Sequence, residues 1–270
     1  MRFGIITDIH YAAGQDDRPL QECTSGWQRN GVNFVMQLGD LVRGDNKEEA
    51  RIELHQAKSV LQYFQGNIYH VLGNHCLAVP EQELMQELGL DMPYYSFVVE
   101  DFRFILLYGM DVSIHRKPET PEDAGMLGYY LDRPELHDYC GAIGKQQEAW
   151  LQEALEIADR SGEKVIIICH FPLLPETTDA KHGLLWNHRE IYDILSSSSA
   201  VKACLGGHYH NGGYAMAHGI HFIILPAFVN HAEHPSFRSG SVELERSKMV
   251  IRNQHNEIFY DLDLKQGLIQ

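Results

Sequence analysis

The stretch RFGIITDIH at residues 2–10 joins a short apolar run directly to an aspartate and a histidine. The run is rich in β-branched and aromatic residues and ends in polar ones, which is typical of a short strand buried in a sheet. Asp8 and His10 lie two positions apart just beyond it, and in an extended segment such residues point to the same side. The stretch therefore predicts a buried strand that brings two polar side chains to one place.

Later parts of the chain repeat this arrangement of an apolar run followed by polar side chains. These later stretches are LGDLV at 38–42, GNH at 73–75, ICHFPL at 168–173 and GGHYH at 206–210. Each follows a run that is predicted to be a strand, and strand ends in sheet-based folds gather functional residues from distant parts of the chain. We therefore expect the polar residues of all these stretches to meet.

Together the stretches supply side chains that suit a pair of metal ions. The ligand candidates are Asp8, His10, Asp40, Asn74, His170, His208 and His210. Mixed oxygen and nitrogen donors suit Mn²⁺, Fe or Zn²⁺, and the two oxygens of a carboxylate such as Asp40 can bridge two ions. Two ions about 3.5–4 Å apart can hold a phosphate, activate water and stabilise the leaving oxygen. Any one stretch alone is more often a turn or a cap, but the full set in this order favours a dinuclear metal site.

The rest of the sequence alternates predicted helices and strands. Apolar residues at spacings of three and four predict helices at 47–65, 145–160 and near 188–196. Short apolar runs predict strands at 2–7, 33–38, 67–72, 94–99, 102–108, 164–169 and 201–206, and near 214–217, 220–225, 239–244, 248–253 and 257–262. The first half reads as α/β and the end as a β-meander, and two sheets packed face to face with helices outside satisfy both. The chain has no repeat or linker, so we expect one domain over residues 1–270.

Composition narrows the classes of function. With 22 Lys+Arg against 37 Asp+Glu, the formal charge is −15, and such a chain repels nucleic-acid backbones. A small anionic substrate still fits, because bound metal ions reverse the charge locally. Five widely spaced cysteines without a C-x-x-C pair predict free buried thiols. The N-terminus lacks a signal-peptide pattern and no apolar run is long enough to span a bilayer, so we expect a soluble cytoplasmic protein without a membrane partner.

The order D-x-H, G-D, G-N-H, H and G-H-x-H resembles the calcineurin-like metallophosphoesterase superfamily from Asp8 to His210. The resemblance implies a four-layer α/β/β/α sandwich, with two mixed sheets face to face and helices outside. It implies that one ion is held by Asp8, His10, Asp40 and His210, and the other by Asp40, Asn74, His170 and His208. A metal-bound hydroxide would attack phosphorus, and His75 would stabilise the transition state or protonate the leaving group. Asp40, Asn74 and His75 are thus the catalytic candidates.

A narrower resemblance rests on longer segments. YYSFVVEDFRFILLYGMD, GAIGKQQEAWLQEAL, EKVIIICHFPLLPE, LLWNHREIYDIL and GGHYHNGGY together resemble the manganese-dependent ADP-ribose/CDP-alcohol diphosphatases. That resemblance implies manganese as the favoured metal and a nucleotide-derived substrate whose pyrophosphate is hydrolysed to release a nucleoside monophosphate. Two positions differ from the patterns. The diphosphatases usually have Gln in place of His10, and Cys76 stands where the superfamily has an acid that orients the preceding histidine.

Other residues are weaker candidates. Arg43 could contact a substrate phosphate, Trp186 could stack on a nucleobase and Asn211 could reach substrate, although a surface ion pair, a core tryptophan and a turn residue are the alternatives. No role is predicted for His182, which lies in a loop-like region. The alternative functions are a cyclic-nucleotide or glycerophosphodiester phosphodiesterase or a phosphomonoesterase of the same fold. A non-catalytic scaffold is disfavoured because every ligand candidate is present.

Overall fold

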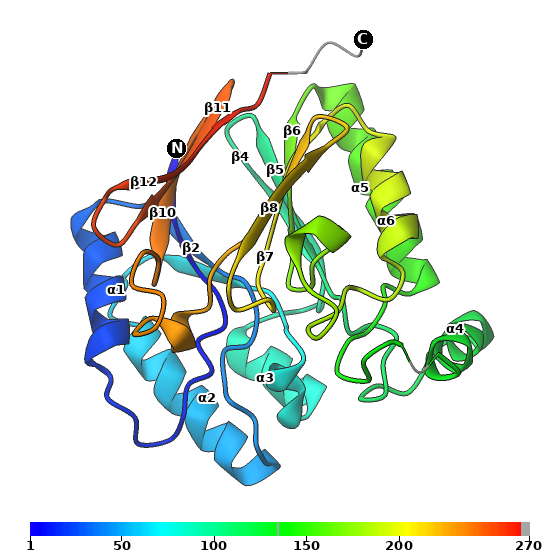
Figure 1. Ribbon diagram of the computed structural model, residues 1–270, viewed down its shortest axis with the longest axis horizontal. Helices are drawn as coiled ribbons and strands as arrows, with labels where there is room; N and C mark the ends of the chain where they lie inside the picture. The colour runs from blue at the N-terminus through cyan, green and yellow to red at the C-terminus, as the bar shows by residue number, and fades with distance from the viewer. Residues whose placement is uncertain (134, 266–270) are drawn as a thin grey trace.

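The computed structural model describes residues 1–133 and 135–265. Two six-stranded sheets pack face to face with helices on the outer side of each, and Figure 1 shows the four layers side by side. The first sheet has the order β12-β11-β10-β1-β2-β3. Its strands are β1 (Arg2–Ile6), β2 (Phe34–Gln37), β3 (Asn67–His70), β10 (Gly240–Glu245), β11 (Lys248–Asn253) and β12 (Ile258–Asp263). The predicted α/β/β/α sandwich is confirmed.

The second sheet has the order β4-β5-β6-β7-β9-β8. Its strands are β4 (Tyr95–Val99), β5 (Phe102–Leu107), β6 (Lys164–Cys169), β7 (Val201–Gly206), β8 (Gly213–Ala217) and β9 (Ile220–Ile224). Both sheets are mixed, because a parallel group is extended by antiparallel strands. The expected C-terminal meander is correct only for β10 to β12, since β8 and β9 complete the second sheet and the chain then crosses back to the first.

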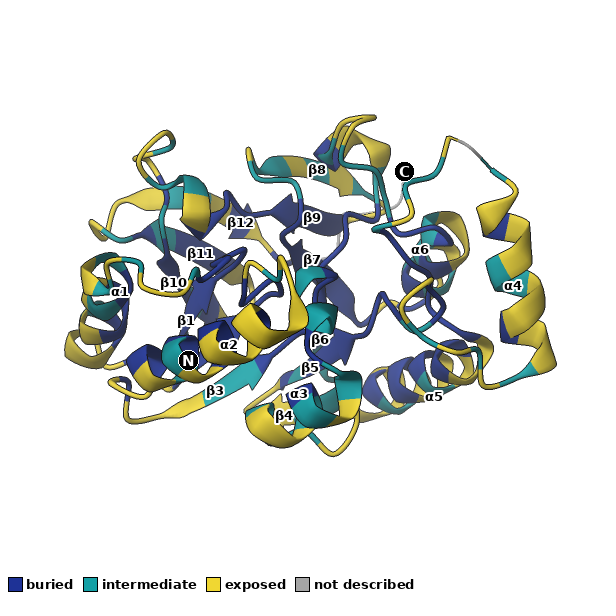
Figure 2. Cartoon of the chain, turned by 90° about the horizontal axis from the view of Figure 1, so that it is seen from below, coloured by how far each residue is buried: buried dark blue, intermediate teal, exposed yellow. Residues whose placement is uncertain are grey.

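Alternating side chains explain why the central strands of the two sheets are buried on both faces. In β1, Phe3 and Ile5 lie in the core between the two sheets, whereas Ile6 faces the helical layer. In β6, Ile166 lies between the sheets and Ile167 faces the helices. Side chains of a strand point to opposite faces in turn, so a sheet covered on both sides needs apolar residues at every position. Figure 2 shows the result, with buried strands between helices that are exposed on their outer sides.

Each outer layer has two main helices, placed by local sequence signals. α1 (Arg18–Arg29) and α2 (Lys47–Leu61) cover the first sheet, and α5 (Lys145–Ser161) and α6 (His188–Ser196) cover the second (Figure 1). The side chain of Asn46 accepts the backbone N–H of Glu49 and caps α2. Gly162 ends α5 with a left-handed φ of 68°. The helices predicted from the apolar spacing are therefore present within a few residues of their expected ends.

Three helices are not predicted by the sequence pattern: α1, α3 (Glu81–Leu88) and α4 (Pro121–Leu131). α3 is only eight residues long, and α4 contains Gly125 and Gly128, which weaken helix propensity. α1 has Gly26 in its last turn, and tertiary packing holds the helix in place. The indole of Trp27 packs against Gly4, where an added Cβ would lie 2.9 Å from the ring, and its N–H donates to the carbonyl of Gly240 at 2.9 Å. Packing of this kind supplies most helix stability in proteins.

The strands that precede the polar stretches all end at the junction of the two sheets. Backbone hydrogen bonds join the segments there: Phe228 donates to the carbonyl of Thr7 at 3.0 Å, and Gly207 donates to that of His170 at 3.0 Å. Three short 3₁₀ turns also lie along these connections, η1 (His75–Ala78), η2 (Pro175–Thr177) and η3 (Phe228–Asn230). Loops joined in this way form a rigid frame for the polar side chains they carry.

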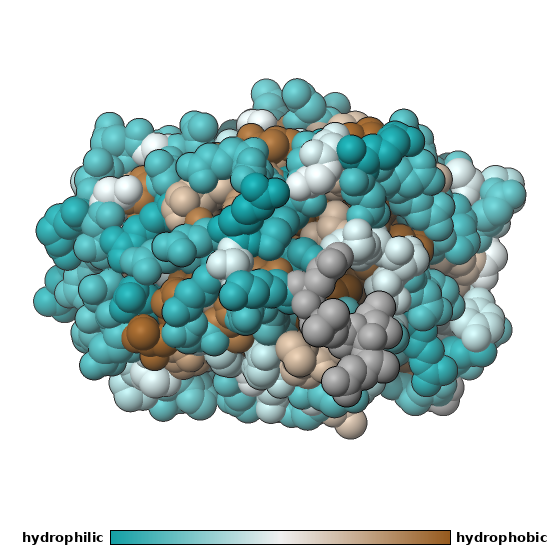
Figure 3. Space-filling model, turned by 90° about the horizontal axis from the view of Figure 1, so that it is seen from above, coloured by the Kyte–Doolittle hydropathy of each residue, from teal (hydrophilic) through white to brown (hydrophobic). Residues whose placement is uncertain are grey.

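Three features of the structure relate to the amino-acid composition: the cysteines, the surface and the character of the helices. All five cysteines are free and buried, as the sequence predicts. The face in Figure 3 is mostly hydrophilic, with hydrophobic residues in small separate patches. Over residues 1–133 and 135–265, no helix combines the length and the apolar character that crossing a membrane requires.

Candidate metal centre

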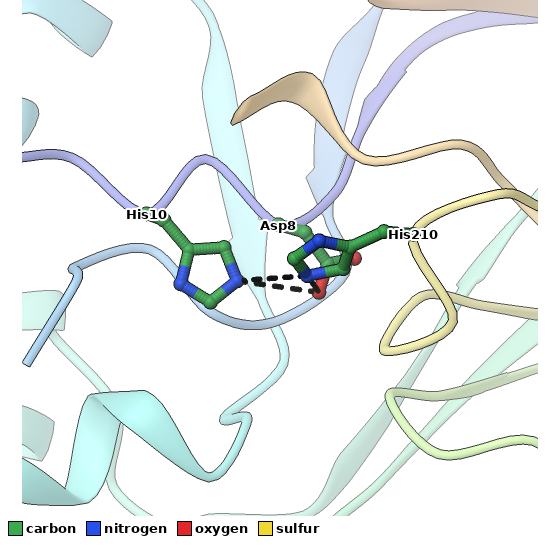
Figure 4. A group of neighbouring side chains, drawn as sticks. All are labelled: Asp8, His10 and His210. Atoms are coloured by element: carbon green, nitrogen blue, oxygen red, sulfur yellow. Dashed lines mark hydrogen bonds and ion pairs between the residues drawn. The ribbon is translucent and has the colours of Figure 1, made fainter. Parts of the chain in front are cut away.

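One group of donor atoms gathers Asp8, His10 and His210 around a common point (Figure 4). The Nε2 atom of His10 lies 3.7 Å from Oδ1 of Asp8 and 3.2 Å from Nε2 of His210. The same carboxylate oxygen is 3.7 Å from Nε2 of His210. Asp8 is fully buried, whereas 30% of the His210 side chain is exposed. The group is therefore anchored in the interior and open to solvent on the His210 side.

A second group adjoins the first through Asp40. Its Oδ2 atom lies 3.2 Å from Nε2 of His170 and 3.7 Å from Nε2 of His10. Asp40, His170 and His208 bring their donor atoms within 4.8 Å of one another, as do His10, Asp40 and His75. The other carboxylate oxygen of Asp40 accepts the backbone N–H of His75 at 2.9 Å. Asp40 is thus the residue that faces both groups.

In two of the candidate ligand histidines, a backbone carbonyl fixes which ring nitrogen carries hydrogen. Nδ1 of His170 donates to the carbonyl of Leu38 at 2.9 Å, and Nε2 of His208 donates to that of His182 at 2.8 Å. A carbonyl can only accept, so a neutral ring in this arrangement leaves its other nitrogen with a free lone pair. Ligand histidines are usually oriented in this manner.

Unpaired buried atoms provide a direct test of whether metal ions fit. Oδ1 of Asn74 is buried and has no hydrogen-bond partner among the described residues, and the buried Nε2 of His170 meets only the carboxylate of Asp40, at 3.2 Å. A buried polar atom without a partner costs about 1–3 kcal/mol, so such atoms call for a ligand. His170 lies in a group of carboxylate and imidazole donors, which divalent ions of the Mn²⁺ type accept, and Asn74 directly precedes His75, whose backbone N–H donates to Asp40. The residues therefore fit a metal site.

Left-handed backbone geometry aims several of these side chains. Asp8, His10, Asp40 and His208 have φ values of 48°, 42°, 50° and 68°. Non-glycine residues rarely adopt this region, and each instance costs roughly 1–3 kcal/mol. Backbone hydrogen bonds hold the geometry in place, because Asp8 donates to the carbonyl of Gly39 at 3.1 Å and His10 donates to that of Asp40 at 3.0 Å. Strain concentrated on candidate ligands is typical of a functional site.

Glycines next to the donors allow a close approach that side chains would block. A Cβ at Gly73 would overlap Oδ1 of Asp40 and lie 2.6 Å from its backbone nitrogen. A Cβ at Gly207 would overlap the hydroxyl of Thr7, which donates to Oδ2 of Asp8 at 2.6 Å. Sequence reasoning missed Gly73, Gly207 and Thr7, although their positions directly before ligand candidates were a usable signal.

The charges of neighbouring side chains shift the pKa values of the candidate ligands. Burial alone would lower the pKa of His170, but the neighbouring Asp40 carboxylate outweighs it and raises that pKa to about 9. Burial would raise the pKa of Asp40, but His170 and His10 hold it well below its usual range. Burial, with a contribution from His170, lowers the pKa of His208 to about 3. Without metal, His170 therefore keeps a proton that metal binding has to displace.

The weaker candidates occupy different places. Arg43 lies half exposed, and its guanidinium pairs with Asp45 at 2.7 Å. Asn211 is exposed, and its amide donates to the hydroxyl of Tyr209 at 3.3 Å. Trp186 is only 5% exposed and its N–H donates to the carbonyl of His137 at 3.0 Å. Its ring packs in the core, so the nucleobase-stacking role predicted for Trp186 does not fit the structure.

His75 is oriented by a carbonyl, and the position after it points into the core. Nδ1 of His75 donates to the carbonyl of Arg43 at 2.6 Å, and its ring meets that of His10 edge to face at 4.5 Å. Cys76 is 1% exposed, and burial raises the pKa of its thiol to about 11, so the thiol stays neutral. The Arg43 carbonyl thus supplies the contact to His75 that the missing acid cannot make.

Metal binding should stabilise the protein measurably. Mn²⁺ at a hundredfold excess over its dissociation constant contributes about 2.7 kcal/mol. For a chain of this size that corresponds to a rise in melting temperature of roughly 5–10 °C. Differential scanning fluorimetry of chelator-treated protein, with and without Mn²⁺, measures the shift, and Mn²⁺ with excess EDTA is the control. An unchanged melting temperature at saturating Mn²⁺ would contradict the site.

The fold and the site define a class of protein. The family model of the calcineurin-like phosphoesterases matches residues 1–212. The chain belongs to this family and is a metal-dependent phosphoric ester or anhydride hydrolase.

The chain is similar over most of its length to two named enzymes and to one solved structure. The chain is 31% identical over 265 residues to the manganese-dependent ADP-ribose/CDP-alcohol diphosphatase of Arabidopsis thaliana, covering 83% of this chain and 85% of that protein. It is 28% identical to the enzyme of the same name from Oryza sativa subsp. japonica, covering 92% and 89%. A dimetal phosphatase from Danio rerio superposes with a TM-score of 0.85 at 24% identity, covering 99% of both chains. That structure supports the fold.

Proposed function

We propose that this protein hydrolyses the pyrophosphate bond of nucleotide-derived small molecules of the ADP-ribose and CDP-alcohol type, with manganese as the favoured metal. The observation that carries the proposal is the set of donor groups that meet around His10 and Asp40, combined with the unpaired buried Oδ1 of Asn74. The substrate class rests on the names of relatives that align over most of the chain. Five free buried thiols fit a reducing compartment such as the cytoplasm.

The proposal assigns ligands to two positions. The first ion would be held by Asp8, His10, Asp40 and His210, and the second by Asp40, Asn74, His170 and His208. The short distances around His10 support the first set, and the contact between His170 and Asp40 and the unpaired Oδ1 of Asn74 support the second. When bound, such ions activate a water molecule and neutralise the charge of the phosphate. No thiol takes part, because burial raises the pKa values of Cys76 and Cys140 to about 11 and about 12.

His75 would act on the substrate and not on the metal. Its Nδ1–H is committed to the Arg43 carbonyl, which leaves Nε2 as the atom available to substrate. In the cationic form of the ring Nε2 also carries hydrogen, and in that form it would donate to the leaving oxygen and stabilise the negative charge that develops there. The backbone N–H of His75 also donates to the Asp40 carboxylate. This bond keeps the His75 ring and the Asp40 carboxylate in a fixed position relative to each other. Asn74, the preceding residue, would orient the phosphate from the second position.

Replacing His75 with alanine should lower turnover without removing metal. Loss of a positioned proton donor reduces kcat by roughly 10²–10⁴-fold. Steady-state kinetics together with metal analysis by mass spectrometry measures both quantities on one sample. His55→Ala is a control, because His55 lies on the exposed side of α2. A large loss of metal in His75→Ala would mean that the residue is a ligand.

The substrate class is tested by direct comparison. The Mn²⁺-loaded protein is incubated with ADP-ribose, CDP-choline and cyclic AMP, and the products are separated by chromatography. Release of AMP from ADP-ribose or of CMP from CDP-choline is the expected result. The second candidate is a cyclic-nucleotide or glycerophosphodiester phosphodiesterase or a phosphomonoesterase, because His10 is the superfamily residue and not the Gln usual in the diphosphatases. Cleavage of cyclic AMP alone would favour that candidate and overturn the first.

A further inference from the structure

The orientation of one candidate ligand, His208, depends on a loop that lies outside all of the motif stretches. The carbonyls that orient His170 and His75 belong to Leu38 and Arg43, which lie within or next to the LGDLV stretch. The carbonyl that orients His208 belongs to His182, which lies between β6 and β7 in a segment without a motif. The orientation of His208 therefore rests on how that segment is held.

The segment around His182 is a compact turn. We call residues 179–187 the latch loop. The backbone N–H of His182 donates to Oδ1 of Asp179 at 2.9 Å, and Nδ1 of its ring contacts the same oxygen at 2.7 Å. The N–H of Gly183 donates to the backbone carbonyl of Asp179 at 3.0 Å. These bonds fix the direction of the His182 carbonyl within the latch loop.

A second segment, residues 137–141, anchors the latch loop from outside. The hydroxyl of Tyr139 donates to the carbonyl of Lys181, and Nε2 of His137 donates to the carbonyl of Ala180 at 2.7 Å. In the other direction, the indole of Trp186 donates to the carbonyl of His137 at 3.0 Å. These bonds hold the residues before and after His182 in the chain. The bond from Trp186 also accounts for the burial of its ring.

The two segments also pack closely at Gly183. Its φ is 75°, and an added Cβ would lie 2.8 Å from Cδ2 of His137 and 3.4 Å from the sulfur of Cys140. That sulfur is itself 3.7 Å from the His182 carbonyl and 3.8 Å from Nε2 of His208. A Cβ at position 183 requires either the His137 ring or the latch loop to shift. Because the His137 ring is itself bonded to the Ala180 carbonyl of the latch loop, we expect either shift to disturb the carbonyl that His208 contacts.

We propose that the latch loop and residues 137–141 form a positioning device for His208. The device holds hydrogen on Nε2 and turns Nδ1 toward the second ion, and it rests on the dinuclear site of the proposed function. Gly183 and Tyr139 are its positioning residues, and neither touches substrate or metal. Loss of such outer contacts typically weakens metal binding by about 10–100-fold.

Two glycine variants test the device as a matched pair. Gly183→Ala and Gly162→Ala both place alanine at a left-handed φ, 75° and 68°, but nothing lies within 4 Å of a Cβ at Gly162. Calorimetric titration of the full chain with Mn²⁺ should show one of two sites about 10–100-fold weaker in Gly183→Ala only. Equal Mn²⁺ affinities in both variants and the wild type would overturn the device while leaving the site intact.

A second measurement determines which ring nitrogen of His208 carries hydrogen, and it needs no metal. ¹⁵N NMR of the metal-free wild type should show His208 with hydrogen on Nε2, and Tyr139→Phe, which removes only the hydroxyl anchor, should shift this signal and weaken Mn²⁺ binding. Tyr139→Phe decides the matter if Gly183→Ala does not fold. An Nδ1–H tautomer in the wild type would overturn the device. A wild type that keeps the Nε2–H tautomer but binds no Mn²⁺ would sink the proposed function alone.

Discussion

Replacing Asp40 with alanine removes metal from both positions and lowers kcat/KM by at least about 10³-fold, a loss of roughly 4 kcal/mol in transition-state stabilisation. Asp40 is 1% exposed, and its carboxylate faces His10 on one side and His170 on the other. Removing it takes one ligand from each proposed set at once. It also removes the negative charge that holds both histidine rings beside it. We expect no other single substitution to have as large an effect.

Metal analysis by mass spectrometry and turnover of ADP-ribose check this expectation on the same preparation. Asp45→Ala is the matched control, because Asp45 lies nearby in sequence but is 57% exposed and pairs only with Arg43 among the described ion pairs. Asp45→Ala should retain both metal and activity. Wild-type turnover or full metal content in Asp40→Ala would contradict the shared position of Asp40.

Adding a single methyl group at Gly73 should have the second largest effect. The new Cβ would overlap a carboxylate oxygen of Asp40 and lie 2.6 Å from the backbone nitrogen of that residue. The carboxylate could rotate, but the backbone atom cannot move without shifting the loop after β2. Overpacking of this kind costs about 1–3 kcal/mol. We therefore expect Gly73→Ala to lower both stability and metal affinity, and activity with them.

The comparison that isolates the effect is with Gly26→Ala. A Cβ at Gly26 meets nothing within 4 Å, and the position lies inside α1, where alanine is favoured over glycine. Urea unfolding and Mn²⁺ titration of both variants give the two quantities. Gly26→Ala should bind Mn²⁺ as the wild type does. Normal stability and normal Mn²⁺ affinity in Gly73→Ala would show that the close approach to Asp40 is dispensable.

Most strands could be predicted from sequence because their apolar patterns are strong. RFGIIT and KVIIIC are buried on both faces, and such short runs bounded by polar residues have few other interpretations. Assignment of strands to sheets was harder, since β8 to β12 look alike in sequence yet divide between two sheets. α1 was missed because its stability comes from long-range contacts of Trp27, which no local pattern reveals.

The candidate site shows the same division between local and long-range information. Five ligand-bearing stretches are short and local, so their residue types and order already predicted which side chains meet. Trp186 and His182 were interpreted differently because their roles depend on a partner segment about 40 residues away in the chain, at 137–141. A tryptophan three residues after a glycine could have faced substrate, and only the packing shows that it anchors a loop instead.

Anomalous X-ray scattering from a crystal soaked with Mn²⁺ would locate the metal ions themselves. We expect two manganese peaks roughly 3.5–4 Å apart, one on the His10 side of Asp40 and one on the His170 side. A single peak, or peaks that do not share Asp40, would contradict the dinuclear centre on which the proposed hydrolysis depends.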